Sequence, residues 1–430
     1  MKAQVLGFGF IFILFVLLVD LYSYRGINRL ALNLNSTWTI IVNIAFFALT
    51  AVALFLIIRM VVMSGKIEYQ RLMNIMKKSM GYLILIYVPK LFFILFLLVR
   101  DLIVMFSVLI SRFRIAGSPD GNDLIISRAD FILRLGLIVA VIPFLSIIYG
   151  IWKGKYNYRI SRIKLKFKNL PAEFDGLKIA QISDLHLGSF EDDSSRISPA
   201  IDLVNDENPD VVVFTGDLVN NLASEARPFT GELARLQAKE SKLSILGNHD
   251  YGTYYQWGSE KELRENMEEL YGHHKASGFR LLRNEVFHLD RNGKRVSILG
   301  VENWGEPPFP QYGDLQKVLA CSEGSDFRIL LSHDPSHWDA QVRPGSDIEL
   351  TLSGHTHGMQ FAINIPGWKW SPVKFKYPRW SGLYREGDQY LYVNIGLGFI
   401  AFPGRVGTPP EISIFELRKD EGDGDTSGNI

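Results

Sequence analysis

Long apolar runs dominate the first 152 residues of the chain. Four runs rich in Leu, Ile, Val and Phe cover residues 5–19, 38–63, 80–99 and 131–152. About 20 helical residues cross the hydrocarbon core of a bilayer, and the last three runs reach that length. The first run is shorter and is also typical of a signal peptide, but no small-residue cleavage site follows it. The pattern therefore predicts a transmembrane region of four helices at residues 1–152.

The pattern changes after residue 176, where short apolar runs alternate with amphipathic segments. An Asn292-Gly293 pair between two such runs predicts a hairpin, because Asn-Gly accepts the positive φ angles of a tight turn. The alternation indicates an α/β domain with a mixed sheet at residues 177–418. Strands are predicted at residues 177–182, 211–215, 244–246, 327–331, 349–352 and 391–394, and helices at 194–205, 224–240 and 259–274.

Two further segments lie outside these two regions. The basic residues 153–176 are predicted to be a linker between the two regions. Residues 419–430 are rich in Gly, Asp and Ser, and we expect this tail to be disordered.

The formal net charge of +1 conceals a strong asymmetry. Residues 1–168 contain 21 Lys and Arg against 6 Asp and Glu, whereas the remainder contains 25 against 39. The basic residues gather in the loop at 59–80 and just after residue 152, on the same side as Lys2. Because basic loops stay inside, we expect an integral protein of the inner or plasma membrane with a cytoplasmic C-terminal domain. Basic residues that flank apolar runs argue against a nucleic-acid partner.

A few charges fall within the apolar runs, among them Lys90, Arg100 and Asp101. Such charges are expensive in lipid and are often functional. Alternatively, Lys90 and Arg100 snorkel towards an interface and Asp101 offsets Arg100.

Metal-competent side chains recur where the predicted strands end. They occur in Asp184-Leu185-His186, Gly216-Asp217, Gly247-Asn248-His249-Asp250, Ser332-His333 and Gly354-His355-Thr356-His357. Loops at the carboxyl ends of strands can converge on one site. Two cations about 3.5–4 Å apart can neutralise and orient a phosphoryl group, and a bridging carboxylate can hold them together. Carboxylate, imidazole and amide ligands suit Mn, Fe or Zn, and a nearby imidazolium can protonate the leaving oxygen.

These five motifs, in this order, resemble the calcineurin-like metallophosphoesterase superfamily over roughly residues 177–417. The resemblance implies two mixed β-sheets flanked by helices in four layers. It also implies roles for individual residues. Asp184, His186 and His357 would bind one metal ion, Asn248, His333 and His355 would bind the other, Asp217 would bridge them, His249 would be the catalytic acid, and Asp250 would orient His249.

The longer motifs Ile182-Ser-Asp-Leu-His-Leu-Gly188 and Gly354-His-Thr-His-Gly-Met-Gln360 resemble a membrane-associated branch of that superfamily. This branch includes enzymes similar to the UDP-diacylglucosamine pyrophosphate hydrolases and related phosphodiesterases, and some relatives are exported. Arg405 is a candidate for gripping a substrate phosphate, and a surface salt bridge is the alternative. Residues 367–385 interleave aromatic and basic side chains, which suits either a headgroup interface or an ordinary hydrophobic hairpin.

Together these features predict a membrane-anchored phosphoesterase with two divalent cations. The expected substrate is a phosphate or pyrophosphate ester of an amphipathic, lipid-linked or nucleotide-lipid molecule. The alternative is a membrane sensor or transport-associated protein with a regulatory metal domain. The complete set of metal-competent residues, together with His249, favours the hydrolase.

Overall fold

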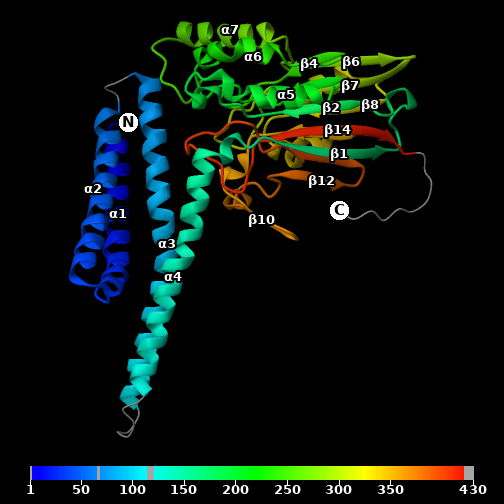
Figure 1. The fold of residues 1–430 in the computed structure, drawn as a ribbon. Helices are drawn as coiled ribbons and strands as arrows, with labels where there is room; N and C mark the ends of the chain where they lie inside the picture. Colours follow the sequence, from blue (N-terminus) through cyan, green and yellow to red (C-terminus); the bar gives the residue numbers. More distant parts are fainter. Residues whose placement is uncertain (1, 65–67, 114–120, 421–430) are drawn as a thin grey trace. The chain divides into compact units, whose positions relative to one another are not determined.

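The computed structural model describes residues 2–64, 68–113 and 121–420. The chain forms two units, residues 1–152 with 401–404, and residues 153–400 with the chain from 405 onward. The first unit contains four long helices, drawn from blue to cyan in Figure 1. These are α1 (Lys2–Ala31), α2 (Ser36–Met63), α3 (Tyr69–Phe113) and α4 (Gly121–Trp152).

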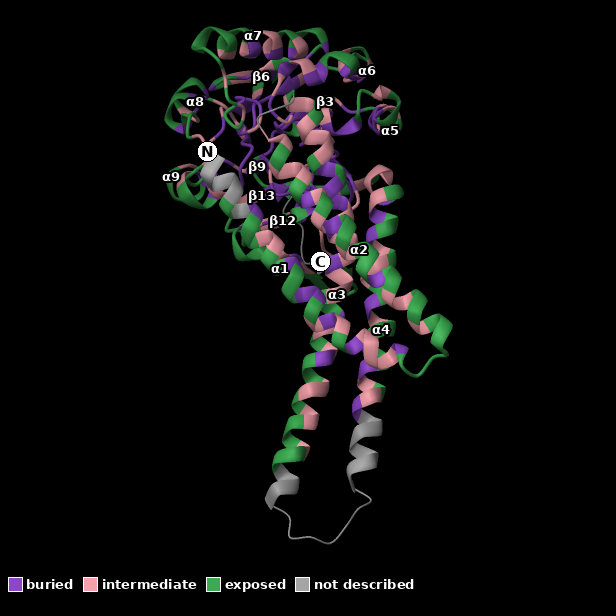
Figure 2. Cartoon of the chain, turned by 90° about the vertical axis from the view of Figure 1, so that its left-hand side faces the viewer, coloured by how far each residue is buried: buried purple, intermediate pink, exposed green. Residues whose placement is uncertain are grey.

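Each of the four helices is long and apolar enough to span a bilayer. The apolar stretches run over Gly9–Ala31, Ser36–Met63, Tyr69–Leu109 and Ala129–Trp152, which confirms the prediction of four helices. The first stretch is longer than predicted, because the helix continues past Asp20 and Arg25 to Ala31. Figure 2 shows exposed residues along all four helices, whereas the described strands β3 and β9 are wholly buried. Lipid-facing helices need no polar surface, so this exposure fits a membrane-embedded protein.

A buried polar cluster links three of the helices. The carboxylate of Asp20 in α1 accepts hydrogen bonds from Thr50 in α2 (2.6 Å) and from Tyr87 in α3 (2.9 Å). Its other oxygen lies 2.5 Å from Nζ of Lys90. The interpretation that Lys90 snorkels is therefore wrong, since Lys90 finds its counter-ion inside the bundle. The predicted pairing of Arg100 with Asp101 is confirmed at 2.7 Å.

The second unit is built on two six-stranded mixed sheets, in agreement with the predicted α/β class. In the first sheet, β14 pairs parallel to β1 and antiparallel to β2, and β2 to β5 are parallel. In spatial order its strands are β1 (Arg159–Phe167), β14 (Glu411–Lys419), β2 (Lys178–Ile182), β3 (Val211–Phe214), β4 (Ser241–Ser244) and β5 (Arg280–Leu281).

The second sheet has a parallel centre with an antiparallel strand at each edge. In spatial order its strands are β12 (Gly382–Glu386), β13 (Gln389–Val393), β9 (Leu350–Ser353), β8 (Phe327–Leu331), β7 (Lys294–Gly300) and β6 (Glu285–Arg291). The predicted Asn292-Gly293 turn joins β6 to β7. A separate hairpin pairs β10 (Ile363–Ile365) with β11 (Trp368–Trp370).

Three apolar cores bind these layers together. The central core lies between the sheets and takes Ile179 and Val213 from one sheet and Ile329 and Leu350 from the other. The outer face of the first sheet packs on helices such as α5 (Ser198–Asp206) and α7 (Glu260–Ala276), with α6 (Thr230–Ala234) beside them. The outer face of the second sheet packs on α8 (Leu315–Cys321) and on the helical turn that leads into α9 (Arg343–Gly345). The result is a helix–sheet–sheet–helix sandwich.

The predicted boundaries need several corrections, and the strand predicted at 244–246 is in fact β4 at Ser241–Ser244. Residues 153–176 are not merely a linker, because β1 lies within them, and its alternation of basic and apolar residues places Leu165 and Phe167 in the core. The helix predicted at 224–240 is broken into a 3₁₀ turn and α6, because Pro228 lacks the amide proton that a continuous helix needs. Lys419, expected in the tail, ends β14, and residues 421–430 lie outside the described residues.

Candidate metal centre

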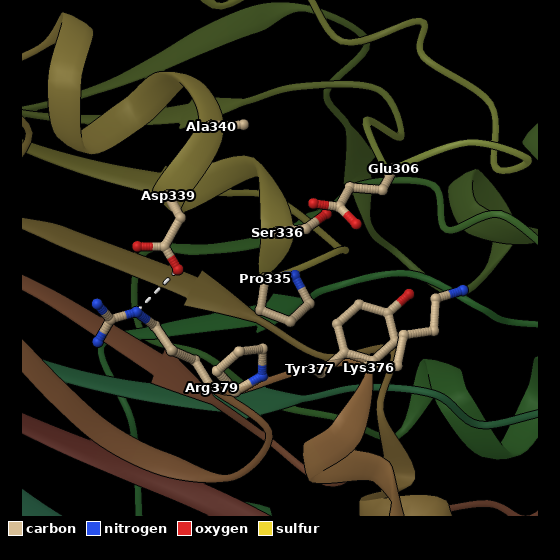
Figure 3. Close-up of a pocket in the computed structure, with 9 residues that line it drawn as sticks. Glu306, Pro335, Ser336, Asp339, Ala340, Lys376, Tyr377 and Arg379 are labelled. Carbon is tan, nitrogen blue, oxygen red and sulfur yellow. Dashed lines mark hydrogen bonds and ion pairs between the residues drawn. The ribbon is translucent and has the colours of Figure 1, made fainter.

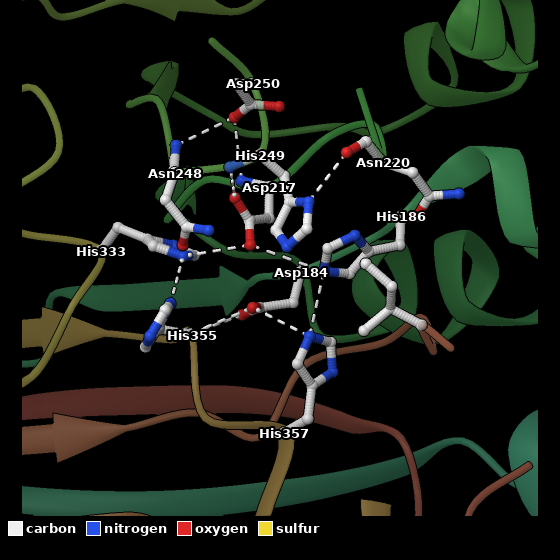
Figure 4. A network of polar contacts seen from close by, with 12 residues as sticks. Asp184, His186, Asp217, Asn220, Asn248, His249, Asp250, His333, His355 and His357 are labelled. Atoms are coloured by element: carbon white, nitrogen blue, oxygen red, sulfur yellow. Dashed lines mark hydrogen bonds and ion pairs between the residues drawn. The ribbon is translucent and has the colours of Figure 1, made fainter. Parts of the chain in front are cut away.

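Seven of the candidate side chains come from loops that follow five different strands, at one edge of the two sheets (Figure 4). The first sheet supplies Asp184 and His186 after β2, Asp217 after β3 and Asn248 after β4. The second supplies the remaining side chains, His333 after β8 and both His355 and His357 after β9. Parallel strands bring their carboxyl ends to the same edge, which is how residues far apart in sequence meet here.

The side chains form two groups of three whose ligand atoms lie within 4.8 Å of one another. In the first group, Nε2 of His357 lies 3.3 Å from Oδ1 of Asp184 and 3.0 Å from Nε2 of His186. The second group is Asp217, His333 and His355.

Asp217, a member of the second group, also lies close to the first group. Its Oδ2 atom is 3.2 Å from Nε2 of His333 in the second group and 3.5 Å from Nε2 of His186 in the first. This position suits a carboxylate shared by two cations.

Asn248 adds an amide oxygen to this centre. Its Nδ2 donates a hydrogen bond to the hydroxyl of Tyr254 (2.9 Å), whereas its buried Oδ1 has no hydrogen-bond partner among the described residues. A buried carbonyl oxygen without a donor is costly unless something else binds it. The orphaned oxygen and the two His/Asp groups therefore fit divalent cations.

The backbone of the centre is strained at the positions that carry the side chains. Five of them have left-handed φ angles, which cost roughly 1–2 kcal/mol each for residues with a Cβ. They are Asp184 (51°), His186 (46°), Asp217 (60°), His355 (72°) and His357 (51°). Gly216 is also left-handed, and a Cβ there would lie 2.5 Å from the backbone nitrogen of Gly247. Such strain concentrates where side chains must be aimed at one point.

Burial and mutual charge set the ionisation of the centre. Burial lowers the pKa of His186 to about 3 and that of His355 to about 4, so both are neutral imidazoles that can act as ligands. Burial also acts to lower the pKa of His333, but the Asp217 carboxylate outweighs it and raises this pKa to about 10. Despite its own burial, Asp217 keeps a pKa well below its usual value, because imidazoles surround it.

His249 reaches the centre with one ring nitrogen already occupied. Its Nδ1 donates to the carbonyl oxygen of Asn220 (2.7 Å), which leaves Nε2 to face the centre, and its ring packs against those of His186 and Tyr254. The sequence predicted that Asp250 would orient this ring, but the Asn220 carbonyl takes that place.

The carboxylate of Asp250 has a different set of partners. It accepts backbone amide hydrogens from Asp217, Leu218, Val219 and Gly247. Asp250 therefore ties the loop of Asp217 to the loop of Asn248 and His249, and acts on the centre through the backbone.

Arg405 has a different role from the predicted phosphate clamp. The side chain is fully buried, and its guanidinium donates to the carbonyl oxygens of Gly398 (2.7 Å) and Ile395 (2.9 Å). A third contact joins it to Nδ1 of His357 (3.1 Å). Burial lowers its pKa to about 10. Arg405 thus stabilises the loop that carries His357 and does not face the open side of the centre.

Two tyrosines that sequence reasoning missed complete the surroundings. The hydroxyl of Tyr377 lies 2.8 Å from Nε2 of His355 and donates a hydrogen bond to the carboxylate of Asp334 (3.3 Å). Tyr254 contacts Asn248 as described above. Neither tyrosine belongs to one of the five motifs, although Tyr254 follows Asn248 by six residues and Tyr377 lies within the aromatic and basic segment 367–385.

Comparison with known proteins agrees with this geometry. Residues 177–359 match the family described as "Calcineurin-like phosphoesterase", and residues 5–155 match "Probable Calcineurin-like phosphoesterase, transmembrane domain". The uncharacterized metallophosphoesterase YkuE of Bacillus subtilis is 33% identical over 263 residues, which cover 59% of this chain and 83% of YkuE. The zebrafish (Danio rerio) transmembrane protein with metallophosphoesterase domain is 27% identical over 292 residues, which cover 66% of this chain and 63% of that protein.

The sandwich of two mixed sheets and the paired Asp/His groups define a metal-dependent phosphoesterase. The chain belongs to the calcineurin-like metallophosphoesterase family and carries the four-helix transmembrane region of a membrane-integral branch. It spans less than two thirds of the zebrafish relative.

Proposed function

We propose that this protein hydrolyses the phosphate or pyrophosphate ester of an amphipathic, lipid-linked molecule at the membrane, with two divalent cations held by the seven residues of the centre. Mn, Fe and Zn suit the mixed carboxylate, imidazole and amide donors best. When bound, such cations neutralise the phosphoryl oxygens and activate water. Side chains of the protein supply the remaining chemistry.

His249 is the proposed general acid. Because Nδ1 is held by the Asn220 carbonyl, Nε2 is the atom that can carry a proton towards the leaving oxygen. The residue is half-buried, as a group that must meet the substrate at the open side of the centre should be. Asp250 acts indirectly by fixing the loops of Asp217 and Gly247.

The observation that carries the substrate class is an exposed apolar surface next to the metal ligands. It is formed by Met359, Ile363, Ile365, Trp368 and Phe375, and we call it the apolar hairpin surface. Met359 follows the ligand His357 by two residues, and Phe375 is 81% exposed. Lys374, whose Nζ lies over the Phe375 ring, adds a cation to it. Aromatic and basic side chains together suit the headgroup level of an anionic bilayer.

The chain connection supports the same substrate class. Only residues 153–158 separate α4 from β1, which limits the span of that connection to about 20 Å. Tethering a hydrolase to a membrane raises its effective concentration towards membrane-bound substrates, and brings no such gain for a soluble ester.

The basic flanks favour a cytoplasmic position for this unit, which a fusion after Lys419 to a reporter active only in the cytoplasm will test.

The test uses the full-length protein in lipid bilayers. We expect an amphipathic phosphate ester to be cleaved far faster than a short-chain soluble analogue, and the Trp368→Ser, Phe375→Ser double variant to lose that preference while cleaving the soluble analogue normally. Trp380 is unsuitable for this test because it is buried. Tyr312→Ser removes a similarly exposed ring from another loop and is the control. Equal rates on both esters in the unaltered protein would refute the substrate class.

A further inference from the structure

A cavity of about 390 Å³ with several charged side chains in its wall opens beside the second group of metal-competent residues (Figure 3). Its walls include Glu306, Ser336, Lys376 and Tyr377. Tyr377 is one of the lining residues, and its hydroxyl also contacts His355, so this side chain connects the cavity wall with the centre. The volume is within the range of small-molecule sites.

Lys376 lies close to the centre without an anionic partner. Its Nζ is 4.5 Å from the centroid of the Phe309 ring and 5.4 Å from that of Tyr377. The edge of Phe309 in turn packs on the His355 ring, with centroids 4.8 Å apart. Among the residues that the structure describes, Lys376 makes no ion pair. An ammonium held over aromatic rings beside a metal ligand is placed to meet an anionic oxygen.

Glu306 supplies the opposite charge. Its carboxylate has no ion pair or hydrogen bond within the described part of the chain, and it faces the cavity together with Tyr377 (Figure 3). Burial, then Asp334 and then Glu306 raise the pKa of Tyr377. The other two charged residues of the wall, Asp339 and Arg379, neutralise each other at 2.9 Å.

The cavity also contains an unsatisfied hydroxyl. Oγ of Ser336 is buried and has no hydrogen-bond partner among the described residues. A free carboxylate, a free ammonium and an orphaned hydroxyl are a poor surface for acyl chains, because each would lose its hydration without compensation. The same three groups match a ligand that has a cation, an anionic oxygen and a further polar atom.

We propose that this cavity is a headgroup subsite for phosphoesters of amino alcohols. The ammonium of the headgroup binds Glu306, and an oxygen of the phosphoryl group or of a headgroup carboxylate binds Lys376. The proposal rests on the proposed function and narrows its substrate class. The apolar hairpin surface would take the lipid part and this cavity the polar part.

Two chromogenic esters that differ by one ammonium group test the subsite, 4-nitrophenyl phosphoethanolamine and 4-nitrophenyl ethyl phosphate. We expect the full-length protein to favour the first about tenfold in kcat/KM, since a hydrogen bond to a charged group contributes about that much. Glu306→Gln should reduce the ratio to about one by raising KM for the first ester alone. Lys376→Met should raise KM for both esters, and Lys317→Met, an exposed lysine on α8 outside the cavity, should change neither.

Binding separates the two proposals. Calorimetric titration with phosphoethanolamine and with ethyl phosphate should show the same preference and the same loss in Glu306→Gln. A protein that cleaves neither ester but binds phosphoethanolamine through Glu306 would refute the proposed function and retain the subsite. Equal kcat/KM for the two esters, or a preference unchanged by Glu306→Gln, would refute the subsite and leave the phosphoesterase intact.

Discussion

The Nε2 atom of His355 lies 2.8 Å from the hydroxyl oxygen of Tyr377. The other ring nitrogen, Nδ1, faces the centre and is 3.3 Å from Nε2 of His333. Since the Tyr377 hydroxyl donates to Asp334, it accepts from Nε2–H of His355. Tyr377 therefore holds His355 in the tautomer whose unprotonated Nδ1 is available to a cation.

Tyr377→Phe should weaken cation binding at the Asp217, His333 and His355 group. A hydrogen-bond partner of a metal-binding imidazole typically contributes about 10–100-fold to metal affinity. We expect a loss of affinity in about that range at one of the two cation sites. Calorimetric titration of the metal-free protein with Mn²⁺ measures it without relying on turnover. Tyr312→Phe is the control, because that exposed ring packs on Tyr251 and not on His355. Unchanged affinity at both sites would show that His355 needs no such support.

Asp217→Asn should reduce occupancy at both cation positions. In the unaltered protein the His249 backbone N–H donates to Oδ1 of Asp217 at 2.9 Å. The amide of the variant keeps an oxygen that can accept this bond, so the loop is preserved while the shared negative charge is lost. Metal analysis of the purified variant checks this, and Asp184→Asn, which alters one group only, should lower occupancy at one position. Two full equivalents of metal in Asp217→Asn would contradict a bridging role.

His249→Ala should retain both cations but lose turnover. With an alkoxide leaving group the loss should be about 10²–10⁴-fold, the usual contribution of a general acid. A nitrophenolate leaves without a proton, so activity on nitrophenyl esters should recover in part. Rates on matched alkyl and nitrophenyl esters give the comparison. A loss of the same size on both would assign His249 to another role.

The sequence predicted more of the centre than of its surroundings, for a physical reason. The ligands lie in short motifs directly after buried strands, so the strand order alone brings His186 and His357 together across 171 residues. The contacts that Arg405, Asp250 and Tyr377 make depend on how the loops fold back towards the centre. The burial of the Arg405 guanidinium among carbonyl oxygens, for example, follows from the path of residues 395–408, which no local pattern encodes.

The boundaries failed for a related reason. In β1 the alternation of Arg, Lys and apolar residues is a strand pattern, but its high charge indicated a linker. Pairing with β14 is what makes the segment a strand, and that partner lies near the other end of the chain. The partner of Lys90 is equally hidden from local patterns, because its counter-ion Asp20 belongs to another helix.

Asp20 and Lys90 form an ion pair within the apolar helices. The carboxylate of Asp20 accepts from three donors, which are Thr50, Tyr87 and Lys90. Among the described helices, the ammonium of Lys90 contacts only Asp20 and the faces of the Phe46 and Tyr87 rings. Removing one partner of a buried pair leaves an uncompensated charge, at a cost of about 3–5 kcal/mol. Asp20→Asn should therefore destabilise the protein more than Lys90→Met, in which two hydroxyls still satisfy the carboxylate.

Thermal unfolding in lipid nanodiscs measures both variants and the double variant Asp20→Asn, Lys90→Met, which should be more stable than Asp20→Asn alone. Arg264→Gln, a largely exposed charge on α7 outside the membrane-spanning helices, should have little effect. If the helices serve only as an anchor, the double variant should cleave amphipathic esters at the normal rate once folded. A folded double variant with normal cations but altered turnover would instead show that the polar cluster communicates with the metal centre, as a sensor requires. A double variant no more stable than Asp20→Asn would show that the two charges do not stabilise the bundle as a pair.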